Sequence, residues 1–150
     1  MSNPFSNSPL KGLTFLVVDD EPDNVGVVVR LLNLMGAQAE TAENGKEGLE
    51  KARTHVPNVM FVDLSMSVMT GWQMLHEAKQ DPALQNIPII ALTAHAMSGD
   101  RERVLNAGFA GYIAKPIDVP VFIPHVLNML RGFPQLNNHF SKAVTEAHQP

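Results

Sequence analysis

The sequence predicts an α/β protein with a doubly wound, five-stranded parallel sheet, and two observations support this fold class. Short apolar runs, which are typical of strands buried on both faces, recur along the chain between turns that contain Pro, Gly or Asn. Longer segments with apolar residues at helical spacing separate these runs. Because the two kinds of segment alternate, we expect a parallel sheet with helices on both of its faces.

Three strands are expected in the first half of the chain, at residues 13–19, 37–42 and 58–62. Pro22 suits the first turn of a helix, and the apolar residues that follow it at helical spacing end before Gly36. Gly26 lies inside this helix, where glycine costs about 1 kcal/mol relative to alanine. Asn44 and Glu47 have the spacing of an N-cap and a capping acid, so they predict a second helix that ends near residue 55.

Two more strands are expected in the second half, at residues 87–92 and 110–114, with a charged helix between them at residues 98–106. Thr70 and Gln73 have capping-box spacing and predict the start of the helix that precedes these elements. The last helix contains Pro120 and Pro124, and an interior proline removes a hydrogen bond and clashes with the preceding turn. We therefore expect this helix to begin at Pro120 or Val121, which leaves Pro124 in or near the first turn.

Composition and length indicate one globular domain without a membrane span. Hydrophobic residues make up 45% of the 150 residues, which is enough for a buried core, and no apolar run is long enough to cross a bilayer. The first residues lack the basic start and apolar core of a signal peptide. The absence of cysteine is typical of a cytoplasmic protein, and the net charge of -4 argues against a nucleic-acid-binding surface.

Three segments are expected along the chain. They are a flexible N-terminal tail at residues 1–11, a folded domain at 12–131 and a polar C-terminal extension at 132–150. The tail is rich in Ser, Asn and Pro, and the extension carries few apolar residues. No output domain is expected after the folded domain.

Polar side chains follow four of the expected strands, and the carboxyl ends of parallel strands meet at the sheet edge where ligands bind. These side chains are Asp19, Asp20 and Glu21, then Asp63, then Thr93, then Lys115. Taken singly, the acid run at residues 19–21 is typical of a solvated loop or a helix cap. Thr93 is typical of a strand-end hydroxyl bonded to the backbone, and Lys115 is typical of a surface lysine. Crowded carboxylates repel one another unless a cation joins them, and oxygen ligands without His or Cys select Mg²⁺ or Ca²⁺. The combination predicts a phosphoryl site.

Four motifs in this order resemble the receiver domain of two-component response regulators: Val17–Glu21, Asp63–Met66 with Met69 and Gly71, Ala91–Ala94, and Tyr112–Pro116. The resemblance covers residues 12–131 and implies a flavodoxin-like (βα)5 fold with strand order 2-1-3-4-5. The stretch at residues 92–97 is most similar to receivers of hybrid kinases and their stand-alone relatives. Ser67 and Thr70 stand where the family often has Pro and Asp, which affects loop shape and helix capping rather than chemistry.

The resemblance implies a phosphoacceptor and a metal site. Asp63 is then the phosphoacceptor, and Asp20, Asp63 and the backbone carbonyl of Ser65 hold Mg²⁺. Asp19 acts mainly through a metal-bound water. The family also uses a cis peptide before the proline that follows its lysine, so we expect the Lys115–Pro116 bond to be cis.

The resemblance also assigns the remaining side chains of the site. Thr93 and Lys115 bind phosphoryl oxygens, and Tyr112 is the aromatic switch that responds when Thr93 moves. Ser65 and His95 flank the path of an attacking water and modulate the lifetime of the phosphorylated state. For His95, exposure to solvent without any such role is the open alternative.

The implied function is a phosphorelay switch. It accepts a phosphoryl group from a phosphohistidine of a sensor histidine kinase or a histidine phosphotransfer protein. It then changes the face formed by the fourth helix, fifth strand and fifth helix for an unknown downstream protein, or passes the phosphoryl group on. We expect an acceptor that dephosphorylates itself rather than a turnover enzyme, in the form of a monomer or homodimer, with no nucleic-acid or membrane partner.

Two alternatives stay open. A phosphatase with an Asp nucleophile usually has a second Asp two residues later as acid and base, where this chain has Ser65. A pseudo-receiver would only bind partners, and the intact acids and Lys115 count against it.

Overall fold

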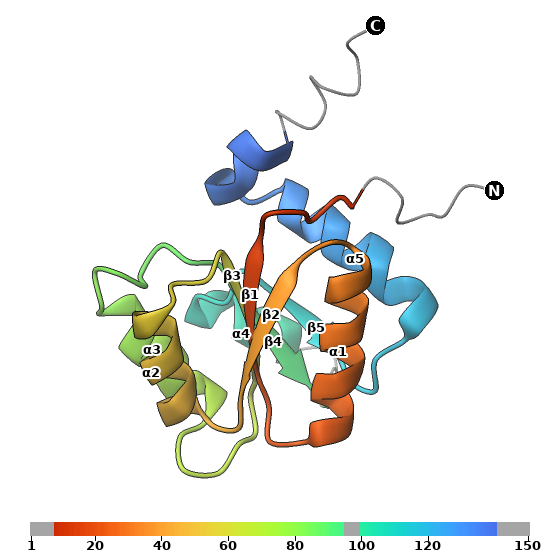
Figure 1. Cartoon of the computed structure of the whole chain (residues 1–150). Helices are drawn as coiled ribbons and strands as arrows, with labels where there is room; N and C mark the ends of the chain where they lie inside the picture. Colours follow the sequence, from red (N-terminus) through yellow and green to blue (C-terminus); the bar gives the residue numbers. More distant parts are fainter. Residues whose placement is uncertain (1–7, 95–99, 141–150) are drawn as a thin grey trace, which may run out of the picture. The chain divides into compact units, whose positions relative to one another are not determined.

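The structure is a computed structural model of the whole chain, and it describes residues 8–94 and 100–140 (Figure 1). The chain divides into two compact units, Met1–Ile117 and Asp118–Pro150. Among the described residues, the first unit holds the sheet and four helices, and the second holds a long α-helix, a 3-10 turn and the helical residues 137–140. Within the described residues, no helix has both the length and the apolar composition needed to cross a membrane.

Five parallel strands form one sheet in the order β2-β1-β3-β4-β5. Their bounds are β1 Thr14–Val18, β2 Gln38–Ala42, β3 Val59–Asp63, β4 Ile89–Thr93 and β5 Gly111–Ala114. Every residue of the central strand β3 is buried, as its continuous apolar run predicts for a strand covered on both faces. The predicted fold class and strand order are confirmed.

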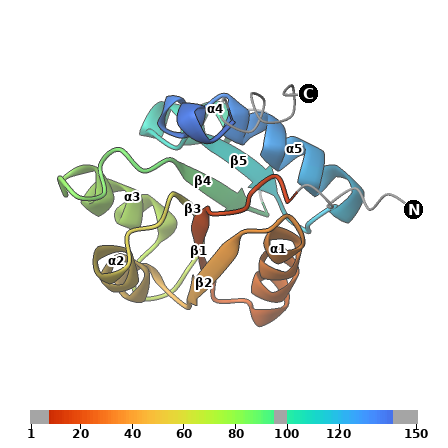
Figure 2. The same ribbon diagram turned by 45° about the horizontal axis from the view of Figure 1, so that its top comes forward.

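The helices of the first unit lie on both faces of the sheet, with α1 on one face and α2 and α3 on the other (Figure 2). Their bounds are α1 Pro22–Leu34, α2 Gly45–Thr54, α3 Gly71–Lys79 and α4 Asp100–Ala107. On the face of α2 and α3, one apolar cluster joins Val18 and Val62 of the strands to Leu49 of α2 and Met74 of α3. On the opposite face, the rings of Phe15 and Phe61 stack with centroids 5.8 Å apart. Strand residues therefore alternate between two apolar layers.

Both predicted caps are present at the helix starts. The Asn44 side chain accepts a hydrogen bond from the Glu47 amide at 2.9 Å, although Glu47 accepts from Glu43 rather than returning the bond to Asn44. The Thr70 hydroxyl accepts from the Gln73 amide at 3.2 Å, and the Gln73 side chain accepts from the Thr70 amide at 2.9 Å. This second pair is a complete capping box, so threonine at position 70 starts α3 without an aspartate.

The second unit contains α5 at Val119–Arg131 and the 3-10 turn η1 at Pro134–Leu136. The helix α5 begins at Val119, next to the expected start near Pro120 or Val121, but Pro124 lies inside the helix rather than in its first turn. The carbonyl of Asp118 accepts from the amides of both Val121 and Phe122, which closes the first turn around Pro120. Pro120 is tolerated there because the first amides of a helix have no partner within it.

The chain segment before β1 packs against the end of α1. Leu10 is completely buried, and its amide donates to the Met35 carbonyl at 2.8 Å. Gly36 has a φ of +95°, and a Cβ at this position would lie 2.7 Å from Cβ of Ser8. Glycine therefore allows both the left-handed turn and the close crossing of the two segments. Packed structure thus begins before residue 12, within the segment expected to be a tail.

The open edge of β2 is partly covered by a lysine of α2. The carbonyl of Ala42 faces β1, where it accepts from the amide of Asp19, so the preceding Thr41 carbonyl faces away from the sheet. The ammonium group of Lys51 donates to this Thr41 carbonyl and also pairs with Glu47 at 3.1 Å. A charged side chain therefore occupies the exposed strand edge.

Alanine at Gly71 and alanine at Gly26 should have opposite effects on stability. A Cβ on Gly71 would lie 2.4 Å from the carbonyl oxygen of Asp63 and 2.9 Å from Cα of Leu64, so α3 would be pushed from the end of β3. We expect Gly71→Ala to lower the free energy of unfolding by about 2–4 kcal/mol. A Cβ on Gly26 meets nothing within 4 Å, and Gly26→Ala should raise that free energy by about 0.5–1 kcal/mol.

Urea unfolding of the parent and the two variants measures both changes. Equal destabilisation by the two substitutions would contradict the difference in available space.

Candidate functional site

The carboxylates predicted at the sheet edge surround one lysine. The ammonium nitrogen of Lys115 lies 3.0 Å from Oδ2 of Asp19, 3.3 Å from Oδ2 of Asp63 and 3.7 Å from Oε1 of Glu21. These residues follow β1, end β3 and follow β5, so the parallel sheet brings together groups that are far apart in the sequence. Only 7% of the Lys115 side chain is exposed. One buried cation is therefore shared by three acids.

Local turns fix the two buried aspartates. Oδ1 of Asp19 accepts from the amide of Glu21 at 2.9 Å, directly before α1 begins. Oδ1 of Asp63 accepts from the amide of Ser65 at 3.1 Å, and the Gly71 amide donates to the Leu64 carbonyl beside it. Each aspartate thus has one oxygen held by its own turn, and its other oxygen faces Lys115.

Burial controls the charge of this cluster, because Asp19 and Asp63 are only 2% and 3% exposed. Burial raises the pKa of Asp63 to about 6; the Ser65 amide and Lys115 oppose this shift, and the charge of Asp19 adds to it. Burial alone would lower the pKa of Lys115, but its contacts with Asp19 and Asp63 outweigh burial and raise that pKa. Lys115 therefore stays charged while Asp63 holds a proton more tightly than an ordinary aspartate.

The acids of the site fit a hard divalent cation. Asp19, Asp20, Glu21 and Asp63 each offer an oxygen, and these oxygens lie within 4.8 Å of one another. Oδ2 of Asp19 is buried and accepts no well-aligned hydrogen bond, although Lys115 lies close to it. Asp20 is exposed and has no partner within the described part of the chain. A donor set made only of oxygen suits Mg²⁺ better than a transition metal.

The other predicted site residues lie around the same edge. Thr93 ends β4 and is 3% exposed, and its carbonyl accepts from the amide of Lys115 at 2.8 Å. Tyr112 of β5 is half-buried and packs against the apolar cluster on the face of α2 and α3. The Lys115–Pro116 peptide bond is cis, as the resemblance predicts. His95 lies outside the described residues.

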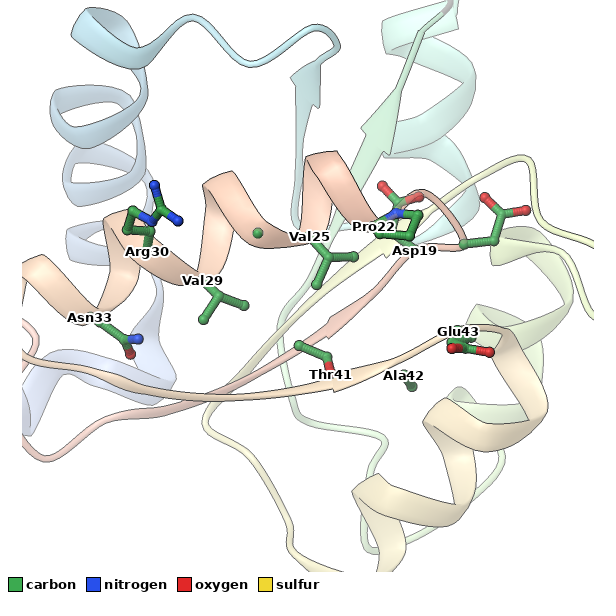
Figure 3. Close-up of a pocket in the computed structure, with 11 residues that line it drawn as sticks. Asp19, Pro22, Val25, Val29, Arg30, Asn33, Thr41, Ala42 and Glu43 are labelled. Atoms are coloured by element: carbon green, nitrogen blue, oxygen red, sulfur yellow. The ribbon is translucent and has the colours of Figure 1, made fainter.

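A groove of about 490 Å³ between α1 and the end of β2 opens beside the acids (Figure 3). Asp19 lies at one end, and Arg30 and Asn33 of α1 lie at the other; Asp20 also lines the groove. Sequence analysis did not find this groove. The sequence feature that indicates this groove is Gly26, a residue that is unfavourable in a helix and that lies among the valines of α1. Its missing side chain leaves part of the groove empty.

Comparisons with known proteins agree with this geometry. Residues 15–126 match the family described as the response regulator receiver domain. The chain is 36% identical over 115 residues to the polar-differentiation response regulator DivK of Brucella anthropi, covering 77% of this chain and 94% of that protein. Two solved structures share the fold. One is the chemotaxis protein CheY4 of Vibrio cholerae, with TM-score 0.72, 26% identity and coverage of 79% of this chain and 98% of that one.

The second is the receiver domain of a sensor histidine kinase from Pseudomonas aeruginosa. It has a TM-score of 0.71 and 29% identity, and the match covers 81% of this chain and 97% of that one. That structure is described with a magnesium ion coordinated in its active-site cleft.

Without divalent cations, Asp63→Asn should stabilise the fold in a pH-dependent way. The raised pKa of Asp63 means that the folded protein binds this proton more tightly than the unfolded chain. The contribution of Asp63 to the free energy of unfolding is therefore most favourable below about pH 4 and is lost as the pH rises through about 6. At pH 7.5 the variant should gain about 1–3 kcal/mol in free energy of unfolding, and the gain should vanish near pH 4.

Chemical denaturation across this pH range, in buffer with a metal chelator, measures the gain. Asp23→Asn, which removes an exposed acid of α1 outside the cluster, is the control. A gain that is the same at every pH would exclude the charge of Asp63 as its cause.

Proposed function

The chain belongs to the receiver domain family of two-component response regulators, and from this premise we propose that it is a phosphorelay switch with Asp63 as its phosphoacceptor. The observation that carries this proposal is the position of Lys115, which lies 3.3 Å from Asp63 and 3.0 Å from Asp19. A buried ammonium group at this position offers a positive charge to phosphoryl oxygens beside Asp63. Asp63 is the acceptor because it alone of the acids ends the central strand β3, beside the strand β4 that ends in Thr93.

The transfer is a displacement at phosphorus. One oxygen of the Asp63 carboxylate attacks the phosphorus of the donor phosphohistidine, the phosphorus–nitrogen bond breaks, and the neutralised imidazole leaves. Because a carboxylate is a weak nucleophile, the site works mainly by stabilising charge on the transferred group. Lys115 and the hydroxyl of Thr93 bind the phosphoryl oxygens. The product is an acyl phosphate, which hydrolyses without a partner and limits the duration of the signal.

Asp20, Asp63 and the backbone carbonyl of Ser65 would hold Mg²⁺ at this site. Asp19 would contribute through a metal-bound water, as the resemblance to receiver domains implies. When bound, Mg²⁺ supplies positive charge to the phosphoryl oxygens. The magnesium ion described in the Pseudomonas aeruginosa receiver domain supports this assignment.

Phosphorylation then changes the protein through Thr93 and Tyr112. The added charge on Asp63 attracts the Thr93 hydroxyl, and Tyr112 turns into the space that Thr93 leaves. This shifts an existing equilibrium of the surface made by α4 and β5, where a downstream protein binds. Ser65 and His95 set the access of water to the acyl phosphate, and their roles stay predictions.

The donor is a sensor histidine kinase or a histidine phosphotransfer protein, acting in the cytoplasm. The receiver acts as an acceptor and loses its phosphoryl group by hydrolysis or onward transfer, rather than by turnover of an external substrate. A phosphatase is less well supported, because the residue two positions after Asp63 is Ser65 and offers no carboxyl group for acid–base catalysis.

Asp63→Asn should abolish uptake of a phosphoryl group from acetyl phosphate in the presence of Mg²⁺, because the nucleophile is removed. Asp23→Asn, which changes a neighbouring acid outside the cluster, should be labelled like the parent. Intact-protein mass spectrometry with a hydroxylamine lability test measures the acyl phosphate. Labelling of the Asp63→Asn variant at the parental rate would overturn the assignment.

Affinity for Mg²⁺ should depend on Asp20 more than on Glu21. Asp20 is exposed and has no partner in the described chain, whereas Glu21 lies 3.7 Å from Lys115 and accepts from Asn24 at 2.8 Å. We expect Asp20→Ala to weaken Mg²⁺ binding at least about tenfold and Glu21→Ala to weaken it much less. Titration with Mg²⁺, followed by the fluorescence of the single tryptophan Trp72 or by calorimetry, measures both. Equal affinities for the parent and Asp20→Ala would refute the ligand assignment.

A further inference from the structure

A second cavity, of about 300 Å³, connects the phosphoacceptor edge to the helix α4. It is lined by Leu64, Ser65, Trp72, Thr93, Asp100, Arg103 and Val104. Ser65 and Thr93 stand next to the acceptor, at the ends of β3 and β4, whereas Arg103 comes from α4. The volume is sufficient for a guanidinium group together with several water molecules.

Arg103 rests on an aromatic ring at this cavity. Its guanidinium carbon lies 4.9 Å from the centroid of the Trp72 ring, and the Trp72 ring packs edge-on against Phe109 with centroids 5.5 Å apart. Among the described residues, Arg103 forms no ion pair. An exposed cation over a ring face is held only weakly. The positive charge of Arg103 is therefore available to a stronger partner.

Phosphorylation would create such a partner. Lys115 already serves three carboxylates, and a phosphoryl group on Asp63 replaces one negative charge with nearly two. A guanidinium group binds phosphoryl oxygens through two parallel hydrogen bonds, which a ring face cannot offer. On the basis of the proposed function of Asp63, we propose that Arg103 leaves the Trp72 ring, enters this cavity and binds the phosphoryl group as a second cation beside Lys115.

This contact pulls on a weakly anchored helix. Val104 is the one buried residue of α4, so little apolar packing resists a shift of that helix. Arg103 responds to a phosphoryl group that is fixed on Asp63.

The neighbouring Arg101 provides a matched control. It is also an exposed arginine of α4 over an aromatic ring, with its guanidinium carbon 5.9 Å from the Tyr112 centroid, but it does not line the cavity. Loss of either arginine removes one positive charge from α4. Only the loss of Arg103 removes a ligand of the phosphoryl group.

The test uses the full chain in saturating Mg²⁺, with beryllium fluoride as a mimic of the phosphoryl group on Asp63. Calorimetry should show affinity for beryllium fluoride reduced about tenfold in Arg103→Gln, less in Arg103→Lys and little in Arg101→Gln. The fluorescence of Trp72 should change on complex formation in the parent and in Arg101→Gln, because the cation leaves the ring. In Arg103→Gln that change should be lost. Circular dichroism confirms that the variants are folded.

Parental affinity in Arg103→Gln would overturn the proposal, as would equal losses in the two glutamine variants, which indicate a general charge effect. An unchanged Trp72 response in Arg103→Gln would overturn it too, because the signal would not come from the arginine. Acetyl phosphate labelling of the parent distinguishes a failure of Asp63 as the phosphoacceptor from a failure of Arg103 as a ligand of the phosphoryl group. If the parent forms no acyl phosphate, the proposed function fails and this proposal fails with it; if the parent is labelled normally, only the role of Arg103 is at issue.

Discussion

The site depends on the ammonium group of Lys115, which is shared by Asp19, Glu21 and Asp63. Buried charges are destabilising unless they are paired, and here one cation offsets several acids only in part. The sheet has to bring its strand ends together against this residual repulsion, and the apolar layers on both of its faces supply the stability to do so. The excess negative charge that remains is what makes the edge suitable for a cation and responsive to a change of charge on Asp63.

The sequence was sufficient for the fold class and for the residues at the strand ends, because both depend on local patterns. A short apolar run that ends in Asp63 predicts a buried strand and places its carboxylate at the ligand-binding edge. Other features depend on contacts between distant residues and leave no local signal. Nothing near Leu10 shows that it packs beneath Met35, and nothing near Trp72 shows that Arg103 lies over its ring.

The loop after Asp63 shows how the chain departs from the usual family residues while the start of α3 is preserved. Val68 in this loop has a φ of 71°, which is unfavourable for a β-branched residue, and its side chain is 78% exposed. The neighbouring Met69 is fixed against Gly45 of α2, where a Cβ would lie 2.9 Å from the methionine side chain. With Met69 held on one side and the Thr70 cap on the other, the loop can change shape at Ser67 and Val68 without moving the acceptor.

The hydrogen bond from Lys51 to the Thr41 carbonyl has a consequence for solubility. The strand β2 contains no proline, and Glu40 is its one charged residue, so its own sequence gives its open edge limited protection against pairing with another chain. The side chain of Lys51 adds to this protection. Acetylation of Lys51 would remove the charge and its pairing with Glu47, and only a neutral amide N–H would remain to donate to the Thr41 carbonyl. A single modification on α2 would thereby weaken the protection of this edge against self-association through the sheet.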